Sequence, residues 1–186
     1  MSRVWSQRQR SSPRAWLILL LAVAAIALIS AWFDRLPGPI DGHALAVDGD
    51  TLRIGDRRVR LVDLDAPELD QTCFDAQGAE WACGAAARSF LADILKRDAV
   101  SCVRTGRDSY GRALAACRLG EEDIGAQIVS AGWAVADFGY LAEEGRAQAA
   151  RRGIWAGNFV APAEWRRRGR NDLGLGIWEW IRSWFQ

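Results

Sequence analysis

Four short runs of this sequence carry side chains that could hold a cation and a phosphodiester in one site. They are Asp48-Gly-Asp-Thr51, Arg60, Asp65-Ala-Pro-Glu68 and Tyr110-Gly-Arg112. Carboxylate oxygens are the ligands that Ca²⁺ and Mg²⁺ prefer, and the planar fork of arginine matches two phosphate oxygens at once. Taken singly, such residues mostly form solvated surface, but together they are typical of metal-assisted phosphodiester hydrolysis.

The positions of these residues predict a role for each. Asp50 lies in a tight turn that opens a strand, and Asp65 closes the strand that contains Arg60, so the two carboxylates could converge on one cation. Glu68, stiffened by the preceding proline, is a candidate general base for an attacking water. Arg60 and Arg112 could neutralise the charge that builds on the phosphate in the transition state.

Other catalytic schemes fail for lack of residues. His43 is the only histidine, which argues against Ser-His-Asp, Cys-His and histidine-metal chemistry. The four cysteines include no C-x-x-C pair, and no glycine-rich phosphate loop is present. Four of the 24 basic residues precede residue 15, so the remaining chain is slightly acidic, unlike a protein that coats nucleic acid.

The N-terminal segment predicts export. Residues 15–33 carry no charge and are long enough for one spanning helix. Four arginines and no acidic residue precede them, so residues 1–14 are expected in the cytoplasm and the rest outside, in the periplasm or at the cell surface. We expect an uncleaved membrane anchor over 15–33 and a linker over 34–42, with a cleaved signal peptide as the alternative.

All four cysteines follow this segment, which favours disulfides in an oxidising compartment. Three pairings are possible. We favour Cys102–Cys117, facing each other across a hairpin, and Cys73–Cys83 within a loop. Four reduced, buried cysteines are the alternative.

Residue patterns predict an α+β fold: a five-stranded OB-fold β-barrel with three packed helices, preceded by the transmembrane helix. The strands are expected over 44–47, 51–54, 57–64, 99–104 and 112–119, and the helices over 84–96, 123–131 and 141–152. We expect one monomeric domain over 43–165. Residues 166–186 form a basic, Trp-rich tail. Its helix either packs on the domain or frays in solvent, or it lies on the membrane surface.

The pattern D-G-D-T, R-x4-D-A-P-E and D-x-Y-G-R, continuing into Ala134 and Gly153-Ile-Trp155, resembles the thermonuclease (staphylococcal-nuclease-like) family over about residues 43–160. The resemblance implies Ca²⁺-dependent hydrolysis of DNA and RNA that leaves 3′-phosphate ends. It implies these roles: Asp50, Asp65 and the backbone carbonyl of Ala66 as Ca²⁺ ligands, Asp48 as their support through water, Glu68 as general base, Arg60 and Arg112 on the phosphate, and Tyr110 and Tyr140 lining the nucleotide pocket.

The chain departs from that pattern at three places. Asp63 lies two residues before Asp65, where many relatives carry glycine, and we expect it to pair with an arginine rather than add charge near the metal. Phe138 replaces a second tyrosine and would stack on a base without a hydroxyl contact. The loop over 69–82, with its cysteines, would reshape the rim of the site.

Two other functions stay open. An OB module could bind nucleic acid or another partner without cutting it, although such a module would not need this full set of charged residues. An envelope scaffold would depend on the anchor and the Trp-rich tail instead.

Overall fold

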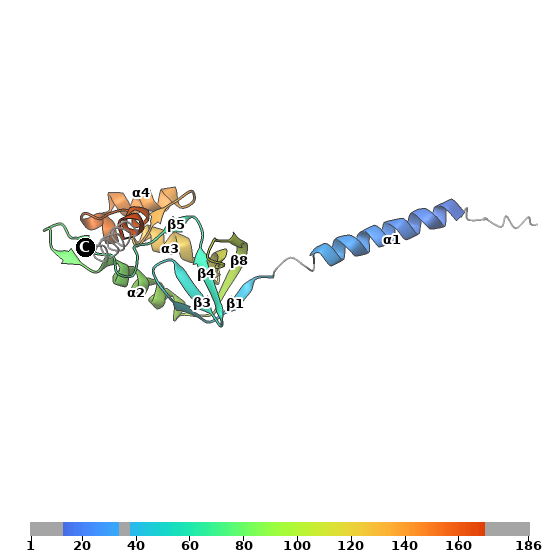
Figure 1. The fold of residues 1–186 in the computed structure, drawn as a ribbon, viewed down its shortest axis with the longest axis horizontal. Coiled ribbons are helices and arrows are strands. Elements are labelled where there is room, and N and C mark those ends of the chain that lie inside the picture. Colours follow the sequence, from blue (N-terminus) through green and yellow to red (C-terminus); the bar gives the residue numbers. More distant parts are fainter. Residues whose placement is uncertain (1–12, 34–37, 170–186) are drawn as a thin grey trace, which may run out of the picture. The chain divides into compact units, whose positions relative to one another are not determined.

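The computed structural model describes residues 13–33 and 38–169 of this 186-residue chain. The chain divides into two compact units, Met1–Gly38 and Pro39–Gln186 (Figure 1). Almost all of the predicted basic tail over 1–14 and most of the Trp-rich tail over 166–186 lie outside the described residues.

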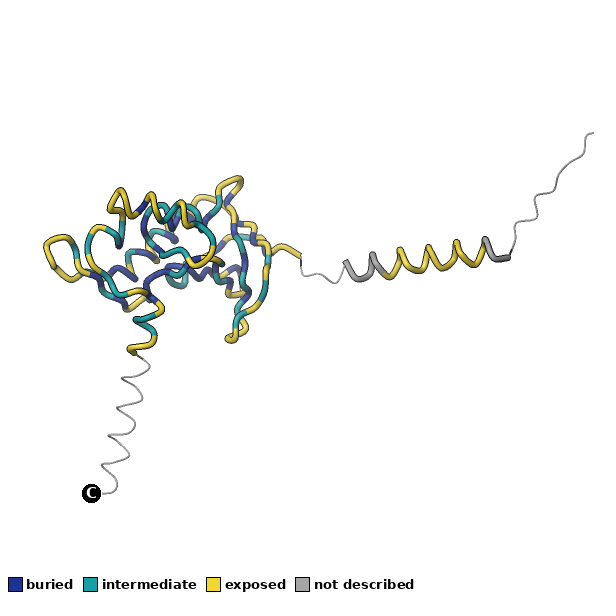
Figure 2. The backbone as a smooth tube through the Cα atoms, turned by 90° about the horizontal axis from the view of Figure 1, so that it is seen from above, coloured by how far each residue is buried: buried dark blue, intermediate teal, exposed yellow. Residues whose placement is uncertain are grey.

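The first unit contains one helix, α1 (Pro13–Phe33). Its side chains are described over 16–28 and are exposed throughout that stretch (Figure 2). Within the part of the chain that the structure describes, no helix is both long and apolar enough to cross a membrane. The spanning helix expected over 15–33 stays a prediction.

The second unit is built on a seven-stranded sheet in the order β1-β8-β9-β4-β3-β2, with β10 paired to β9. Its strands are β1 (Ile40–Gly42), β2 (Ala44–Ala46), β3 (Thr51–Ile54), β4 (Arg57–Leu61), β8 (Val100–Arg107), β9 (Ala113–Leu119) and β10 (Glu122–Asp123). All pairs are antiparallel except β4 with β9. This parallel pair brings the strand that bears Arg60 beside the strand that follows Arg112.

The predicted five-stranded barrel needs correction, because the main sheet has seven strands and its path of paired strands does not close. Its two edge strands, β1 and β2, are consecutive in the chain and separated by His43. Gly42 has a φ of +142°, and the chain changes partner there, so that β1 pairs with β8 and β2 pairs with β3. The domain also begins earlier than the predicted residue 43.

Two short sheets of two strands each lie outside this sheet. β5 (Leu64–Asp65) pairs with β11 (Val135–Ala136), and β6 (Cys73–Phe74) pairs with β7 (Glu80–Trp81). The second pair occupies the segment predicted as an irregular loop. Both predicted disulfides are confirmed: Cys73–Cys83 closes this segment, and Cys102–Cys117 joins directly opposed residues of β8 and β9.

The three predicted helices are present as α2 (Cys83–Leu95), α3 (Ile124–Ser130) and α4 (Leu141–Ala149). A 3₁₀ turn, η1 (Gly153–Ala156), and a helical segment over 162–169 follow them. Asp123 caps α3 as predicted, since its Oδ1 accepts a hydrogen bond from the Ala126 N–H at 2.9 Å. α2 packs on β2 and α3 packs on β9, which closes the apolar core.

Candidate active site

A tight turn between β2 and β3 positions Asp50. The Asp48 Oδ1 accepts hydrogen bonds from the N–H groups of Asp50 at 3.0 Å and Thr51 at 2.6 Å, as in an Asx turn. Gly49 is required because a Cβ there would lie only 2.7 Å from the Ala66 Cβ. The close approach lets the Asp50 Oδ2 accept a hydrogen bond from the Ala66 N–H at 3.3 Å.

Arg60 joins the two carboxylates predicted to bind a cation. Its side chain starts from β4, opposite Thr51 of β3. Its Nη1 lies 2.8 Å from the Asp50 Oδ1, and its Nη2 lies 2.8 Å from both the Asp50 Oδ2 and the Asp65 Oδ1. Carboxylate oxygens that are fifteen positions apart in the chain therefore converge on one positively charged nitrogen.

Burial destabilises the ionised form of the Asp50 carboxyl. Its exposed fraction is 3%, and burial raises the pKa of its carboxyl to about 7. Arg60 lowers the pKa, while the neighbouring carboxylates of Asp48 and Asp65 raise it again. A further positive charge beside Asp50 would relieve this penalty.

This pair of carboxylates fits a hard cation. Within the described ranges, no group of three or more His, Cys, Asp or Glu side chains is arranged to hold a metal ion. Two carboxylates with a backbone carbonyl and water are nonetheless an ordinary oxygen shell for Ca²⁺. The guanidinium nitrogen of Arg60, 2.8 Å from an oxygen of each carboxylate, stands in for the cation's charge.

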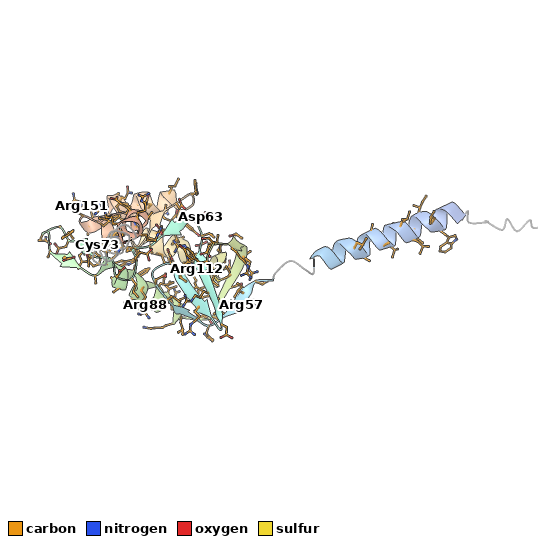
Figure 3. The ribbon with its side chains drawn as sticks, in the orientation of Figure 1. Arg57, Asp63, Cys73, Arg88, Arg112 and Arg151 are labelled. Atoms are coloured by element: carbon orange, nitrogen blue, oxygen red, sulfur yellow. A yellow bond between two sulfur atoms is a disulfide. The ribbon has the colours of Figure 1, made fainter. Side chains whose placement is uncertain are left out.

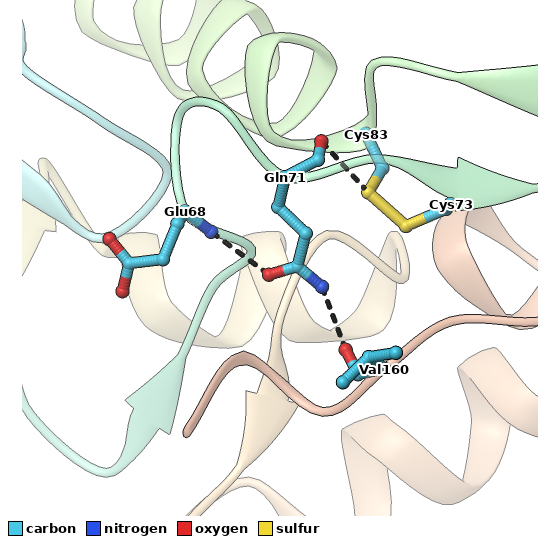
Figure 4. Close-up of a disulfide and its surroundings, with 5 residues drawn as sticks. All are labelled: Glu68, Gln71, Cys73, Cys83 and Val160. Atoms are coloured by element: carbon cyan, nitrogen blue, oxygen red, sulfur yellow. Dashed lines mark hydrogen bonds between the residues drawn. A yellow bond between two sulfur atoms is a disulfide. The ribbon is translucent and has the colours of Figure 1, made fainter. Parts of the chain in front are cut away.

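Glu68 is held by the backbone around it. Its N–H donates to the Gln71 Oε1 at 3.2 Å, and its carbonyl accepts from the Gln71 N–H at 2.8 Å. Gln71 is fully buried, and its Nε2 donates to the Val160 carbonyl at 2.7 Å (Figure 4). The Cys83 Sγ lies 3.5 Å from the Gln71 carbonyl oxygen, so the disulfide supports the same turn (Figure 4).

The first turn of α2 packs directly against this loop at Gly84, whose N–H donates to the Gln71 carbonyl at 3.1 Å. A Cβ on Gly84 would overlap the Glu68 carbonyl oxygen. We therefore expect Gly84→Ala to lower the free energy of unfolding by about 1–3 kcal/mol and to reduce any activity that depends on Glu68. Thermal unfolding measures the first effect.

Gly145 provides the matched control, because it lies inside α4 and nothing lies within 4 Å of its would-be Cβ. Gly145→Ala should stabilise the domain by about 0.5–1 kcal/mol through helix propensity. If both substitutions shifted the unfolding temperature in the same direction, close packing at Gly84 would not explain the result.

The β8–β9 hairpin positions Arg112 through Asp108. The Asp108 Oδ2 accepts from the Arg112 Nε at 2.6 Å, and its Oδ1 accepts from the backbone N–H groups of Tyr110 and Arg112 at 2.9 Å each. The Arg112 Nη1 lies 3.4 Å from the Thr51 Oγ1, which brings the guanidinium to the turn that carries Asp50. Figure 3 labels Arg112 among the side chains of the domain.

The sequence interpretation assigned no role to Asp108. Burial alone would raise the pKa of this carboxyl, but hydrogen bonds from Arg112 lower it below its usual value. Asp108 is therefore a fixed negative partner that orients Arg112. Its spacing of four residues before the arginine, within the D-x-Y-G-R run, was the available signal.

These groups surround one cavity of about 580 Å³. Its lining residues are Asp48, Asp50, Arg58, Arg60, Ala66, Pro67, Glu68, Asp108, Tyr110, Arg112, Leu114 and Arg166. The Tyr110 ring is 80% exposed at its rim, with the Arg112 guanidinium carbon 5.6 Å from its centre. The cavity therefore combines acidic and basic groups beside one exposed aromatic ring.

Tyr140 does not line this cavity. Its hydroxyl donates to the Asp123 Oδ1 at 3.0 Å, and its ring is packed close to Gly125 at the start of α3. Burial, and then the Asp123 charge, raise the pKa of this phenol. The geometry gives no support to Tyr140 as part of the nucleotide pocket.

Asp63 also differs from expectation. Its φ of +62° breaks the strand between β4 and β5, so the predicted alternation of side chains with Asp65 does not apply. No ion pair of the described residues includes Asp63, and the expected arginine partner is therefore absent from that part of the chain. Phe138, the residue expected to stack on a base, is 87% exposed.

Arg166 is the largest omission of the sequence interpretation, which ended the domain at residue 165. Its Nη1 lies 2.9 Å from the Asp65 Oδ1 and 2.7 Å from the Glu68 Oε1, and its Nη2 lies 2.9 Å from the Asp65 Oδ2. Nothing in the sequence distinguished this arginine from Arg167 and Arg168.

Comparison with known proteins identifies the family of this chain. The family model described as staphylococcal nuclease homologue matches residues 58–157, which include Arg60, Asp65, Glu68 and Arg112. The chain belongs to the staphylococcal nuclease family. An uncharacterized endonuclease of Haemophilus influenzae is 33% identical over 140 residues, covering 69% of this chain and 73% of that protein.

Two further relatives match this chain over different shares of their own length. A micrococcal nuclease of Shigella flexneri is 31% identical over 173 residues, or 81% of this chain and 91% of that protein. A succinoglycan biosynthesis protein of Rhizobium meliloti is 39% identical over 99 residues. The chain spans about half the length of that last protein, since the match covers 52% of each.

Proposed function

We propose that this protein is a Ca²⁺-dependent nuclease that hydrolyses phosphodiester bonds of DNA or RNA. The observation that carries the proposal is the convergence of Asp50 and Asp65 on one nitrogen of Arg60, 2.8 Å from each, beside a cavity that Asp50, Arg60, Glu68 and Arg112 line. Membership of the staphylococcal nuclease family supports the same reaction class and the 3′-phosphate products.

In this mechanism the protein's own groups have separate tasks. Asp50, Asp65 and the Ala66 carbonyl would hold Ca²⁺, with Asp48 in support through water, and the bound ion would supply positive charge to a phosphate oxygen. Glu68 takes a proton from the attacking water. Arg60 and Arg112 donate hydrogen bonds to the phosphate oxygens as their charge increases.

Asp108 contributes by fixing Arg112 before substrate arrives. A guanidinium held at 2.6 Å by a carboxylate needs little reorganisation to present its remaining N–H groups. Tyr110, exposed beside Arg112, is placed to contact the nucleotide.

The test is cleavage of single-stranded DNA by the purified chain, in Ca²⁺ and in EDTA. We expect cleavage in Ca²⁺ and none in EDTA, because Asp50 and Asp65 need a bound cation to act on the phosphate. Equal cleavage in EDTA would contradict the metal dependence. DNA binding without cleavage in either buffer would instead support a non-catalytic OB module.

We also propose that residues 15–33 anchor this nuclease in a membrane, with the catalytic domain outside the cytoplasm. The uncharged sequence of that segment and the arginines before it support the anchor. The two disulfides of the domain support an oxidising compartment. Protease accessibility of the domain in intact spheroplasts would test the orientation.

A further inference from the structure

Arg166 occupies the oxygens that the proposed reaction needs. It reaches Asp65 through two parallel hydrogen bonds of 2.9 Å and Glu68 through a third of 2.7 Å, while its side chain is 35% exposed. Two-fold pairing of this kind is among the stronger hydrogen-bond arrangements in proteins. The contact therefore holds the segment over 162–169 against the site.

The pairing of Arg166 and the proposed reaction require the same carboxylate oxygens of two residues, Asp65 and Glu68. The Asp65 Oδ1 accepts hydrogen bonds from Arg60 and Arg166, and its Oδ2 accepts from Arg166, so neither oxygen is available to a cation. The Glu68 Oε1, which could take a proton from water, already accepts from Arg166. A guanidinium within 3 Å of these oxygens also repels a cation directly.

A neighbouring cavity could receive the Arg166 side chain. A second cavity, of about 470 Å³, shares Arg60, Leu114 and Arg166 with the first, and Asp65 lines only the second. Asp63 and Asp137 also line the second cavity, and neither carboxylate takes part in an ion pair with another described residue. A rotation of the Arg166 side chain would move its charge from Asp65 toward these two carboxylates.

We propose that Arg166 is an internal counter-ion that closes the site in the cation-free protein and competes with the cation for Asp65. The inference rests on the proposed function, because it takes Asp50 and Asp65 as the cation ligands. Loading the site requires Arg166 to leave Asp65 and Glu68 for the cavity lined by Asp63 and Asp137. The competitor raises the cation concentration at which the enzyme switches on.

The test is direct calcium titration of the full chain by isothermal calorimetry, without substrate. Arg166→Gln and Arg166→Ala should bind Ca²⁺ about tenfold or more tightly than the unchanged protein, because a competing positive charge is removed. Arg166→Lys, which keeps the charge, should stay closer to the unchanged protein. Arg168→Ala is the control, since Arg168 pairs with Glu164 in the same segment and does not line the site.

Unchanged or weaker binding in both uncharged variants would overturn the inference and leave the proposed function standing. Failure of every variant and of the unchanged protein to bind Ca²⁺ would overturn the calcium site itself. Activity gives the second readout: half-maximal cleavage should need less Ca²⁺ in Arg166→Gln, with the same rate at saturation. A lower saturated rate at unchanged affinity would instead identify Arg166 as a substrate-binding residue.

Discussion

Glu68→Gln should lower the rate of DNA cleavage at saturating Ca²⁺ by about 10²–10⁴-fold, since a positioned general base typically contributes that factor. The amide has the size of the carboxylate but takes no proton from water. The backbone of residue 68 is fixed by Gln71 rather than by its own side chain, so the fold should be unchanged. Single-turnover cleavage and far-ultraviolet circular dichroism measure the two quantities.

Glu164→Gln is the control for that measurement. Glu164 is also paired with an arginine, Arg168, at 2.6 Å, but it does not line the cavity. Its replacement should leave the rate within about twofold, as expected for an exposed ion pair of little energetic weight. Near-normal turnover of Glu68→Gln would assign the base to another group.

Asp50→Asn should have the second large effect: loss of the calcium response together with greater stability of the cation-free protein. Ca²⁺ at a hundredfold its dissociation constant should stabilise the unchanged chain by about 2.7 kcal/mol, and the variant by much less. Thermal unfolding with and without Ca²⁺ measures this difference.

The sign of the stability change follows from the Asp50 pKa, which burial raises to about 7 in the folded protein, against about 3.9 in an unfolded chain. The folded state therefore holds the proton more tightly, and stability falls as the pH rises from about 4 to about 7. Asparagine removes this loss, so the variant should be more stable by up to about 4 kcal/mol at about pH 8 and equally stable near pH 4.

Asp93→Asn is the matched control, because Asp93 is exposed and pairs with Lys96, the residue that follows α2. Its stability should not differ from that of the unchanged protein by more than about 0.5 kcal/mol. A cation-free Asp50→Asn variant that is less stable than the unchanged protein at about pH 8 would show that the ionised Asp50–Arg60 pair is a net stabilising contact.

Local patterns predicted most of the secondary structure because each signal is local. Turn residues bracket β3 and β4, the apolar spacing of Leu91, Ile94 and Leu95 predicts α2, and Asp123 marks the start of α3. The two disulfides followed from the hairpin that places Cys102 opposite Cys117 and from the short separation of Cys73 and Cys83. The partner change at Gly42 was not predictable, because it depends on which strands lie nearby.

The missing parts of the site are long-range contacts. Arg166 meets Asp65 across 101 positions and Glu68 across 98, and no periodicity or motif in the sequence carries that information. Tyr140 shows a second long-range contact that the sequence does not reveal, because its hydroxyl donates a hydrogen bond to Asp123, and its role in the pocket stays a prediction. The types of charged residue in the site could be predicted, but not which arginine contacts Asp65 and Glu68.

The hydrogen bond between Gln71 and Val160 joins residues 89 positions apart. During synthesis the chain emerges from its N-terminus, so the turn that carries Glu68 is complete long before Val160 exists. Its last anchor forms only when nearly the whole domain has left the ribosome. A chain interrupted before that point lacks the contact that fixes its proposed base. The ability to cleave DNA would therefore appear only at the end of synthesis and would not increase gradually with chain length.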